Sequence, residues 1–541
     1  MANGGGRWAR PPARGLWSAT ARRRWSPPMR TCTKPCWAGG RGGRPAPSEE
    51  DKTMTLRVMM LQPPSPPGLN VKRDYAGGMG VADPSPRTRF GHDAGYITLP
   101  YMSLLYATAV LEREGFAVSF LDAQAEDLDL DAVVERVRAA QPQAVVSVVN
   151  LPSLAGDLEV LRALRGGAPG ARTVAIGTVI GPLFETVARS GAADAAVRGD
   201  PEAVLPALLR QLLGAAAPDP VRFESAAGVL VNRAPARVED LNALPPLPYH
   251  LVPIEKYWYH GFGPGVKYAA VFASRGCSFK CYYCPYPMGF GDRIVHRDPI
   301  AVVDEIETLQ RRYGVQGILF RDQVFTMDWP KTRALCEEIL RRGLRIEWVV
   351  ETRLDRVNGE LLRLMKAAGC RRIHYGLESG DPKLFSRVGK DGAEGRMEQL
   401  IRNFTLTERL GIHPHMFVLI GLLGETEASI ARTIEVIRRI KPLTLQVAVV
   451  TPYPGTPLFE EARRQGLLAT EDWSRYTGFQ AVSRTEALSG AELAAARERI
   501  LRAHRRATFW KRRRHQARLW AGYLADGSLP RRLWAKWRRR S

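Results

Sequence analysis

The chain has 541 residues, of which 45% are hydrophobic and 25% are charged. This composition is normal for a globular protein, and the length predicts two or three packed domains, which excludes a wholly disordered chain. The net charge of +23 suggests a nucleic-acid partner, but residues 1–53 carry +8 and residues 501–541 carry +13, which leaves +2 for the rest. We therefore expect a near-neutral body with two basic tails, and nucleic acid is not expected as a partner.

Residues 1–53 are rich in Arg, Gly, Pro and Trp and have no apolar periodicity, so we expect a disordered basic extension. No secretory or twin-arginine signal is apparent in it. Met54 stands directly before the first strand pattern, so the extension is either part of the protein or the result of a start codon assigned too far upstream.

From residue 54 to about 215, apolar runs alternate with amphipathic helical patterns of ten to fifteen residues. Runs rich in Val, Ile and Ala occur at 56–64, 117–124, 143–150, 172–178 and 195–200. Buried runs separated by amphipathic helices are typical of a parallel sheet with helices on both faces. The sequence therefore predicts an α/β fold that begins with a doubly wound parallel-sheet domain.

Residues 216–262 change character, because a hairpin pattern is followed by a proline-rich stretch, and we interpret them as a linker with a hairpin. Strand and helix patterns then alternate again, with strands expected at 267–276, 317–323, 345–353, 372–379, 413–425 and 444–456. Six such units over residues 263–480 predict a partial (β/α)6 barrel, with its active site where the strands meet the following loops.

Residues 481–541 are expected to form a helical basic C-terminal region in which tryptophans alternate with Arg and Lys. The simpler interpretation is a solvated tail. The alternatives are peripheral contact with an anionic membrane or binding of RNA. Nowhere is there an apolar run of about 18 residues, so we expect no helix that spans a membrane.

The stretch "SRGCSFKCYYCPYP", residues 274–287, contains three of the seven cysteines of the chain. Structural zinc requires four ligands, and Cys336 and Cys370 lie singly in helix patterns or at helix ends, where buried apolar side chains are the simpler interpretation. Three thiolates leave an open coordination position, which suits catalysis. A thiolate site also indicates a reducing compartment, so we expect a cytoplasmic protein.

Cys277, Cys281 and Cys284, placed after the first barrel strand with Tyr283 just before the last cysteine, resemble the radical S-adenosylmethionine (SAM) superfamily. The resemblance implies that the three cysteines hold a [4Fe-4S] cluster whose fourth iron is chelated by SAM, and that the main chain at Tyr283 meets the adenine. It also implies reductive cleavage of SAM to a deoxyadenosyl radical, with a reductant such as flavodoxin or ferredoxin as partner.

Further motifs of that superfamily occur in the expected order. "YGLESG" resembles its GxESG pattern and implies SAM contacts at Gly376, Glu378 and Ser379. The resemblance also implies cofactor contacts from residues at or near the ends of other strands, namely Asp322, Arg353 and Gly421.

A doubly wound domain ahead of such a barrel resembles the cobalamin-binding branch of the superfamily, which includes radical methyltransferases and anaerobic magnesium-protoporphyrin ester cyclases. The resemblance implies a cobalamin held on strand-end backbone. Candidate contacts are Ser147, Asn150, Gly177, Thr178 and Gly199. The alternative is a degenerate sheet domain that holds no cobalamin and only shapes the active site.

We therefore expect a cobalamin-dependent radical SAM enzyme that transfers a methyl group to an unreactive carbon of a small-molecule substrate. One alternative is a radical SAM oxidoreductase or cyclase with a degenerate N-terminal domain. An RNA-modifying methylthiotransferase would need a second set of three cysteines in its first domain, and residues 54–276 contain none. A non-catalytic iron–sulfur sensor that binds nucleic acid would have no use for the "YGLESG" and "GLLGETE" motifs.

Overall fold

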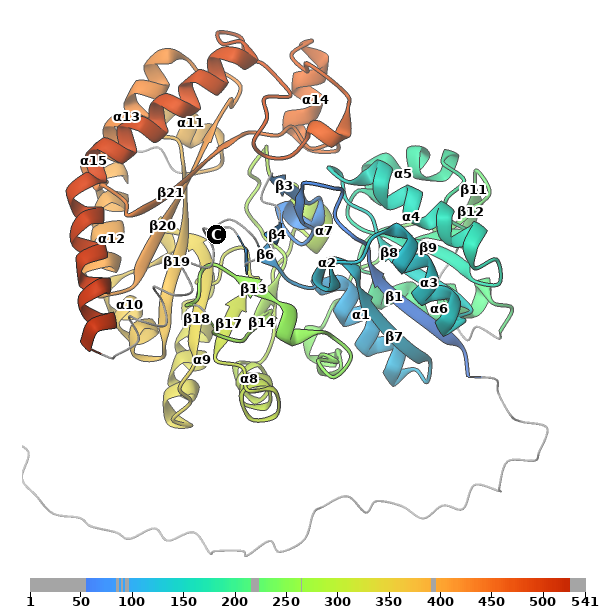
Figure 1. Ribbon diagram of the computed structural model, residues 1–541. Helices are drawn as coiled ribbons and strands as arrows, with labels where there is room; N and C mark the ends of the chain where they lie inside the picture. The colour runs from blue at the N-terminus through green and yellow to red at the C-terminus, as the bar shows by residue number, and fades with distance from the viewer. Residues whose placement is uncertain are drawn as a thin grey trace, which may run out of the picture. The chain divides into compact units, whose positions relative to one another are not determined.

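The structure is a computed structural model and describes residues 55–83, 87–88, 91–92, 97–215, 223–263, 265–390 and 396–525. The predicted basic extension 1–53 and the last part of the predicted C-terminal region, 526–541, lie outside the described residues. The described chain contains two large sheets that follow each other in the sequence, as Figure 1 shows in colour order, and four two-stranded sheets.

The first sheet has seven strands in the order β11-β12-β10-β9-β8-β1-β7. Its five strands from the first part of the chain are parallel and follow the 2-1-3-4-5 order of a doubly wound fold, whose ligand crevice lies where the strand order reverses. The strands are β1 (Arg57–Gln62), β7 (Ala117–Asp122), β8 (Ala144–Val148), β9 (Arg172–Ile176), β10 (Ala195–Ala196), β11 (Phe223–Ala226) and β12 (Val229–Asn232).

Helices cover both faces of this sheet because its strands are apolar on both sides. Val58 and Met60 pack toward one layer, and Met59 and Leu61 pack toward the other. The first layer consists of α1 (Met102–Arg113) and α6 (Pro201–Leu212); the second consists of α3 (Leu130–Ala140), α4 (Leu154–Gly167) and α5 (Ile180–Arg189).

The predicted hairpin of residues 216–262 has a place that the sequence did not indicate. β11 and β12 are antiparallel to each other, and β12 adds to the first sheet in parallel beside β10. The sheet therefore continues as far as Asn232, and the proline-rich connector begins after it.

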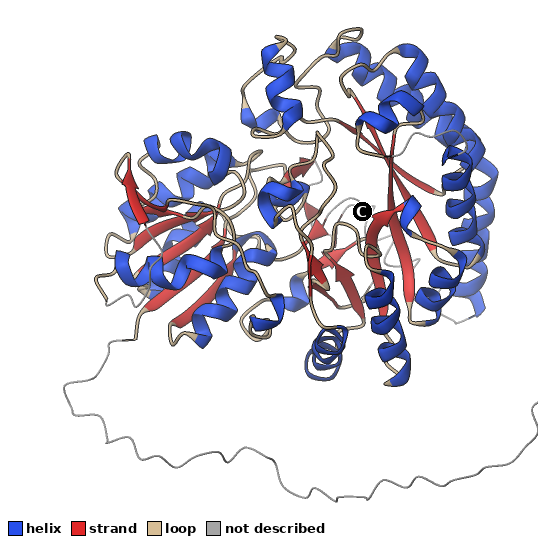
Figure 2. Cartoon of the chain, turned by 180° about the vertical axis from the view of Figure 1, so that it is seen from behind, coloured by secondary structure: helices blue, strands red, loops and turns tan. Residues whose placement is uncertain are grey.

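The second sheet has six parallel strands in their sequence order, β14-β17-β18-β19-β20-β21, with helices between them. The strands are β14 (Tyr268–Val271), β17 (Gly317–Phe320), β18 (Glu347–Arg353), β19 (Cys370–Glu378), β20 (His413–Ile420) and β21 (Thr444–Val449). The helices are α8 (Pro299–Tyr313), α9 (Trp329–Arg341), α10 (Gly359–Ala367), α12 (Arg396–Arg409) and α13 (Glu427–Ile440). Figure 2 shows helices on the outside of these curved strands, which confirms the predicted α/β fold with a partial (β/α)6 barrel.

The barrel helices begin and end at residues that explain their bounds. Asp298 accepts a hydrogen bond from the Ile300 amide and Pro299 follows at the first helical position, and Gly314 ends α8 in the left-handed conformation. Thr426 and Ser429 form a capping box at the start of α13. Because the caps determine where α8 and α13 begin, they also determine where the loops between the preceding strands and these helices end. Loops of this kind carry the site.

The remaining elements are short, except for a long C-terminal helix. They are β2 (Asn70–Lys72), η1 (Ala76–Gly78), β3 (Val81–Asp83), β4 (Arg87–Thr88), β5 (Gly91–His92), β6 (Ile97–Thr98), α2 (Ala123–Glu126), η2 (Leu241–Ala243), η3 (Ile254–Lys256), β13 (Trp258–Tyr259), β15 (Ser274–Arg275), α7 (Tyr286–Phe290), β16 (Val295–His296), η4 (Leu354–Arg356), α11 (Pro382–Arg387), α14 (Pro457–Arg464), η5 (Trp473–Arg475) and α15 (Gly490–Ala525).

Candidate active site

The three cysteines of the CxxxCxxC stretch lie on the loop that follows β14. The Cys277 amide donates to the Gly291 carbonyl at 3.1 Å, and the Cys284 amide donates to the Cys281 carbonyl at 3.0 Å, so the main chain folds the loop tightly. All three side chains line one cavity of about 430 Å³, which lies within the size range of small-molecule sites.

The arrangement of the thiols fits a cluster better than a single metal ion. Within the described residues, no three His, Cys, Asp or Glu side chains are placed to hold one metal ion together. In a [4Fe-4S] cluster each thiolate binds a different iron, so the three sulfur atoms surround the group and need not converge on one point. Burial raises the pKa of all three thiols, and coordination to iron is what makes such thiols ionise.

Glu378, at the end of β19, has a backbone conformation that residues other than glycine rarely adopt. Its φ is +65°, and the pairing of β19 with β20 is irregular between Gly376 and Glu378. The Lys390 ammonium lies 3.2 Å from Glu378 Oε1 and also donates to the Gly376 carbonyl. Such strain costs of order 1 kcal/mol and is found where a site needs a side chain in one particular place.

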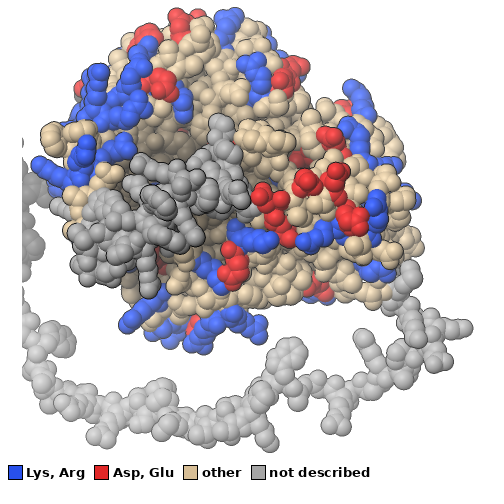
Figure 3. All heavy atoms as spheres, viewed as in Figure 1, with Lys and Arg blue, Asp and Glu red and all other residues tan. Residues whose placement is uncertain are grey.

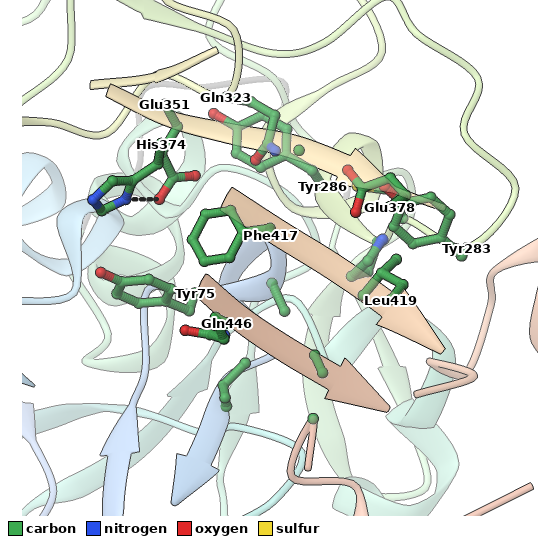
Figure 4. A pocket seen from close by; sticks show the side chains of 18 of the residues that line it. Tyr75, Tyr283, Tyr286, Gln323, Glu351, His374, Glu378, Phe417, Leu419 and Gln446 are labelled. Carbon is green, nitrogen blue, oxygen red and sulfur yellow. Dashed lines mark ion pairs between the residues drawn. The ribbon is translucent and has the colours of Figure 1, made fainter. Parts of the chain in front are cut away.

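Arg353, at the end of β18, is held from two sides. Its guanidinium lies 3.9 Å from the centroid of the Phe279 ring, which belongs to the cysteine loop, and it pairs with Asp355 at 2.8 Å. The cavity is therefore lined at this end by the cysteines, Tyr283, Arg353, Gly376 and Glu378, and Figure 4 shows Tyr283 and Glu378 side by side.

Three other predicted barrel residues lie outside the cavity lining. Asp322 accepts hydrogen bonds from the Ala273 amide at 3.0 Å and the Ser274 hydroxyl at 2.5 Å, so it holds the start of the cysteine loop. The Ser379 hydroxyl accepts a hydrogen bond from the Asp381 amide. The amide of Gly421, a residue with a φ of +88°, donates to the Glu425 carboxylate. These residues act on the shape of the loops around the cavity.

The five predicted cobalamin contacts are engaged by the chain itself. Ser147 is buried within β8, the Asn150 amide donates to the carbonyls of Arg73 and Gly78, and the Thr178 hydroxyl donates to the Gly77 carbonyl at 2.7 Å. A Cβ on Gly177 would stand 2.3 Å from the Val149 carbonyl oxygen, and one on Gly199 would stand 2.1 Å from the Ala236 carbonyl oxygen. In this arrangement they hold the loop 63–80 and neighbouring segments against the sheet, and none of them lines the cavity.

The first-domain residues that do line the cavity are Ile97 of β6 and several residues of the segment 72–83, which follows β1. Tyr75, Ala76 and Gly77 belong to it, and Gly77, Gly78 and Gly80 all have positive φ. A Cβ on Gly77 would stand 2.4 Å from the Cα of Tyr286 in α7, so only glycine permits this close approach to the cysteine loop.

A buried ion cluster also connects the first domain to the cysteine loop. Arg275, two residues before Cys277, pairs with Glu202 and lies 3.7 Å from Asp200, and all three side chains are at most 3% exposed. Asp200 also pairs with Arg237, which donates to the carbonyls of Met288 and Gly289. The "GDPE" turn at residues 199–202 therefore contacts the barrel, and no local pattern predicts this long-range pairing.

The end of the cavity away from the cysteines contains residues that sequence reasoning missed. His374 and His415 point inward from neighbouring positions of β19 and β20, and His260 follows β13. The alternation of inward and outward residues in "RIHYGLE" and "HPHMFVLI" indicates His374 and His415, because a strand presents every second residue to the same side.

The structure combines a partial barrel, which carries the three-cysteine loop after its first strand, with a preceding doubly wound domain of 2-1-3-4-5 strand order. The family model of the "Radical SAM superfamily" matches residues 271–437, and that of the "B12 binding domain" matches residues 95–209. The chain therefore contains a radical SAM domain preceded by a B12-binding domain, which confirms the predicted enzyme class and the predicted cluster, SAM and cobalamin cofactors.

Curated relatives cover most of this chain. An uncharacterized methyltransferase of Pyrococcus horikoshii is 26% identical over 408 residues, which is 73% of this chain and 85% of that protein. The anaerobic magnesium-protoporphyrin IX monomethyl ester cyclase of Cereibacter sphaeroides is 27% identical over 406 residues, which is 72% of this chain and 64% of that protein. The solved structure of the radical SAM methyltransferase TsrM from Kitasatospora setae covers 76% of this chain and 75% of its own, with a TM-score of 0.58 and 19% identity, so it shares the fold.

Proposed function

We propose that the protein transfers a methyl group from SAM, by way of cobalamin, to an unreactive carbon of a small-molecule substrate. The observation that carries this proposal is the single cavity shared by the cysteine loop, the strand ends of the barrel and the segment Lys72–Asp83 of the first domain. Cofactors held on these two parts would meet in one enclosed space, as a radical reaction requires.

Cys277, Cys281 and Cys284 would hold the cluster. Tyr283, Arg353, Gly376 and Glu378 border the space beside them and would hold SAM, with Glu378 toward its amino group and Arg353 toward its carboxylate. Ser379, Asp322 and Gly421 would position these residues through their backbone bonds.

The fit to cobalamin rests on the first-domain segment that lines the cavity. Ala76 and Gly77 present a small side chain and main chain at the cavity wall, which a large flat ring needs for close packing, and Tyr75 adds an aromatic surface beside them. Asn150 and Thr178 would contribute by fixing that segment, since both donate to carbonyls within it.

When bound, the reduced cluster and SAM supply a deoxyadenosyl radical that takes a hydrogen atom from the substrate, and cobalamin supplies the methyl group. The chain's own contribution is enclosure and placement. Tyr75, Tyr286 and Phe417 form apolar walls that keep water from the reacting carbon, and the pair of Lys390 with Glu378 keeps the SAM end of the cavity in one arrangement.

The experiment that tests this function uses the full chain, purified anaerobically with cobalamin supplied and its cluster reconstituted. Reduction in the presence of SAM should give deoxyadenosine, and SAM with a deuterated methyl group should label a compound from a small-molecule extract. Deoxyadenosine without any labelled product would favour the second candidate, a cyclase or oxidoreductase, which the similarity to the porphyrin ester cyclase supports.

We further propose a cytoplasmic location with flavodoxin or ferredoxin as the electron donor, since a low-potential cluster needs a reducing environment. Within the part of the chain that the structure describes, no helix is long and apolar enough to cross a membrane.

The basic helix α15 supports peripheral contact with an anionic membrane as a further proposal. Trp510 is 72% exposed and Phe509 is 48% exposed, and residues 499–525 contain no acidic residue. Lys and Arg gather on the left of Figure 3, where Figure 1 places α12, α13 and α15. Sedimentation with phosphatidylglycerol vesicles should exceed that with phosphatidylcholine vesicles, and Trp510→Ala should reduce it whereas Ile300→Ala, at an exposed site on α8, should not.

A further inference from the structure

The cavity has a second end, opposite the cysteines, whose histidines are not among the residues assigned above to the cluster, SAM or cobalamin. Three inward residues form one row across neighbouring strands, because Glu351 of β18 is in register with His374 of β19, and His374 with His415 of β20. His260 from the turn after β13 lines the same end. Figure 4 shows His374 and Glu351 on one side of Phe417, and Glu378 and Tyr283 on the other.

We call this part of the cavity the histidine end, and it contains His260, His374 and His415. The three side chains differ in the hydrogen-bond partners that the rest of the chain provides. His374 Nε2 lies 3.2 Å from the Tyr259 hydroxyl, and its Nδ1 lies 3.8 Å from Glu351 Oε1. His415 Nδ1 lies 2.9 Å from the Thr444 hydroxyl. His260 Nδ1 is buried without a hydrogen-bond partner in the described part of the chain, which is the situation of an atom that awaits a ligand or water.

All three imidazoles are uncharged at neutral pH. Burial lowers the pKa of His260 to about 4, and burial together with the nearby Arg372 holds the pKa values of His374 and His415 well below the usual value. A neutral imidazole has one nitrogen that donates and one that accepts, so this end can bind a hydroxyl or a carbonyl group.

The charged side chains that line this end already have partners. Lys72 pairs with Asp83, and Glu351 lies 3.8 Å from Arg321, which also bonds to Asp74. A buried charge on a substrate would find no free counter-ion in the described lining and would lose its hydration, which costs several kcal/mol. The cavity lining is rich in aromatic side chains, which include Tyr75, Tyr259, Tyr286, Phe417, Tyr453 and Phe479.

We propose that the histidine end is the substrate site and that it takes an uncharged molecule, with a largely apolar ring body against the aromatic walls and a hydroxyl or carbonyl group hydrogen-bonded to His260 and His415. His374 positions the row through Tyr259 and Glu351. The carbon that reacts then lies between Phe417 and the cysteine end. This inference rests on the proposed function for its reacting partners, whereas the binding chemistry follows from the cavity alone.

Three probes of one ring system test the proposal on the full chain with its cofactors: 1-naphthol, 1-naphthoate and naphthalene. Equilibrium dialysis should show saturable binding of 1-naphthol and at least tenfold weaker binding of 1-naphthoate. His260→Phe and His415→Phe keep an aromatic ring and remove the hydrogen bond. Each substitution should therefore lower the affinity for 1-naphthol about fivefold and change the affinity for naphthalene by less than about twofold. His250→Phe is the control, because His250 is exposed and pairs with Glu112 outside the cavity.

Equal or tighter binding of 1-naphthoate would overturn the proposal and would point to Arg372, two residues before His374 on the same face of β19, as an anchor for anions. If the His260→Phe protein lost the binding of naphthalene as well as that of 1-naphthol, this result would also overturn the proposal. So would the absence of saturable binding by all three probes in a protein that still binds SAM. Cobalamin retention and deoxyadenosine formation, measured on the same samples, report separately on the proposed function.

Discussion

Replacing Glu202 by glutamine is expected to lower the free energy of unfolding by about 3 kcal/mol. Glu202 and Arg275 form an ion pair in which the carboxylate is fully buried and the guanidinium is 3% exposed. Removing one partner of a buried pair costs roughly 3 to 5 kcal/mol because the other charge is left without compensation. The expected value lies at the low end because Asp200 remains 3.7 Å from Arg275 and glutamine keeps an acceptor oxygen.

The assay is urea unfolding monitored by tryptophan fluorescence and circular dichroism. The shift in the urea midpoint is converted into a change in unfolding free energy with the same urea dependence for every variant. Glu239→Gln is the matched control, because Glu239 and Arg293 form an ion pair that is 77% and 70% exposed, and its loss should cost less than about 1 kcal/mol. The double substitution Glu202→Leu with Arg275→Met should recover most of the stability. A loss in Glu202→Gln no larger than that in Glu239→Gln would refute the reasoning.

Three further outcomes follow from the site and the core. Cys281→Ala should abolish the charge-transfer absorption of the reconstituted cluster, whereas Cys336→Ala, in the core, should keep it; equal spectra would contradict the ligand assignment. Gly376→Ala places a Cβ 2.1 Å from Glu378 Oε1 and should weaken SAM binding about tenfold in equilibrium dialysis, whereas Gly181→Ala, whose Cβ meets nothing within 4 Å, should not; unchanged affinity in both would count against Glu378 as a SAM contact. Burial raises the pKa of Asp122 to about 7, so its carboxyl destabilises the fold as pH rises from about 4 to about 7, and the stability advantage of Asp122→Asn in urea unfolding should grow over that range rather than stay constant.

Local patterns predicted the strands, the helices and the cysteine loop because these depend on neighbouring residues. Cys277, Cys281, Cys284 and Glu378 were found from short motifs, and the structure places all four around one cavity. The motif at Asp322 was also found, but its bonds to Ala273 and Ser274 depend on the pairing of β17 beside β14, which no local pattern shows.

What the sequence could not indicate depends on chain segments that meet only after folding. Glu202 and Arg275 are far apart in the sequence, and nothing near either residue indicates the other. The contacts of Asn150 with the loop 63–80 likewise depend on how that loop folds back over the sheet. Glycine-rich residues 77–80 carried a signal that was available, since clustered glycines indicate close backbone approach.

We conclude from the site that one chain binds both a [4Fe-4S] cluster with SAM and a cobalamin, and this conclusion can be tested by composition. Its most direct test is the iron and cobalt content of the full chain, purified anaerobically with cobalamin supplied and its cluster reconstituted, together with deoxyadenosine formation on reduction. On this conclusion we expect about four iron atoms and about one cobalt atom per chain, with deoxyadenosine formed from SAM. An intact cluster that cleaves SAM in a chain that retains no cobalt would contradict it.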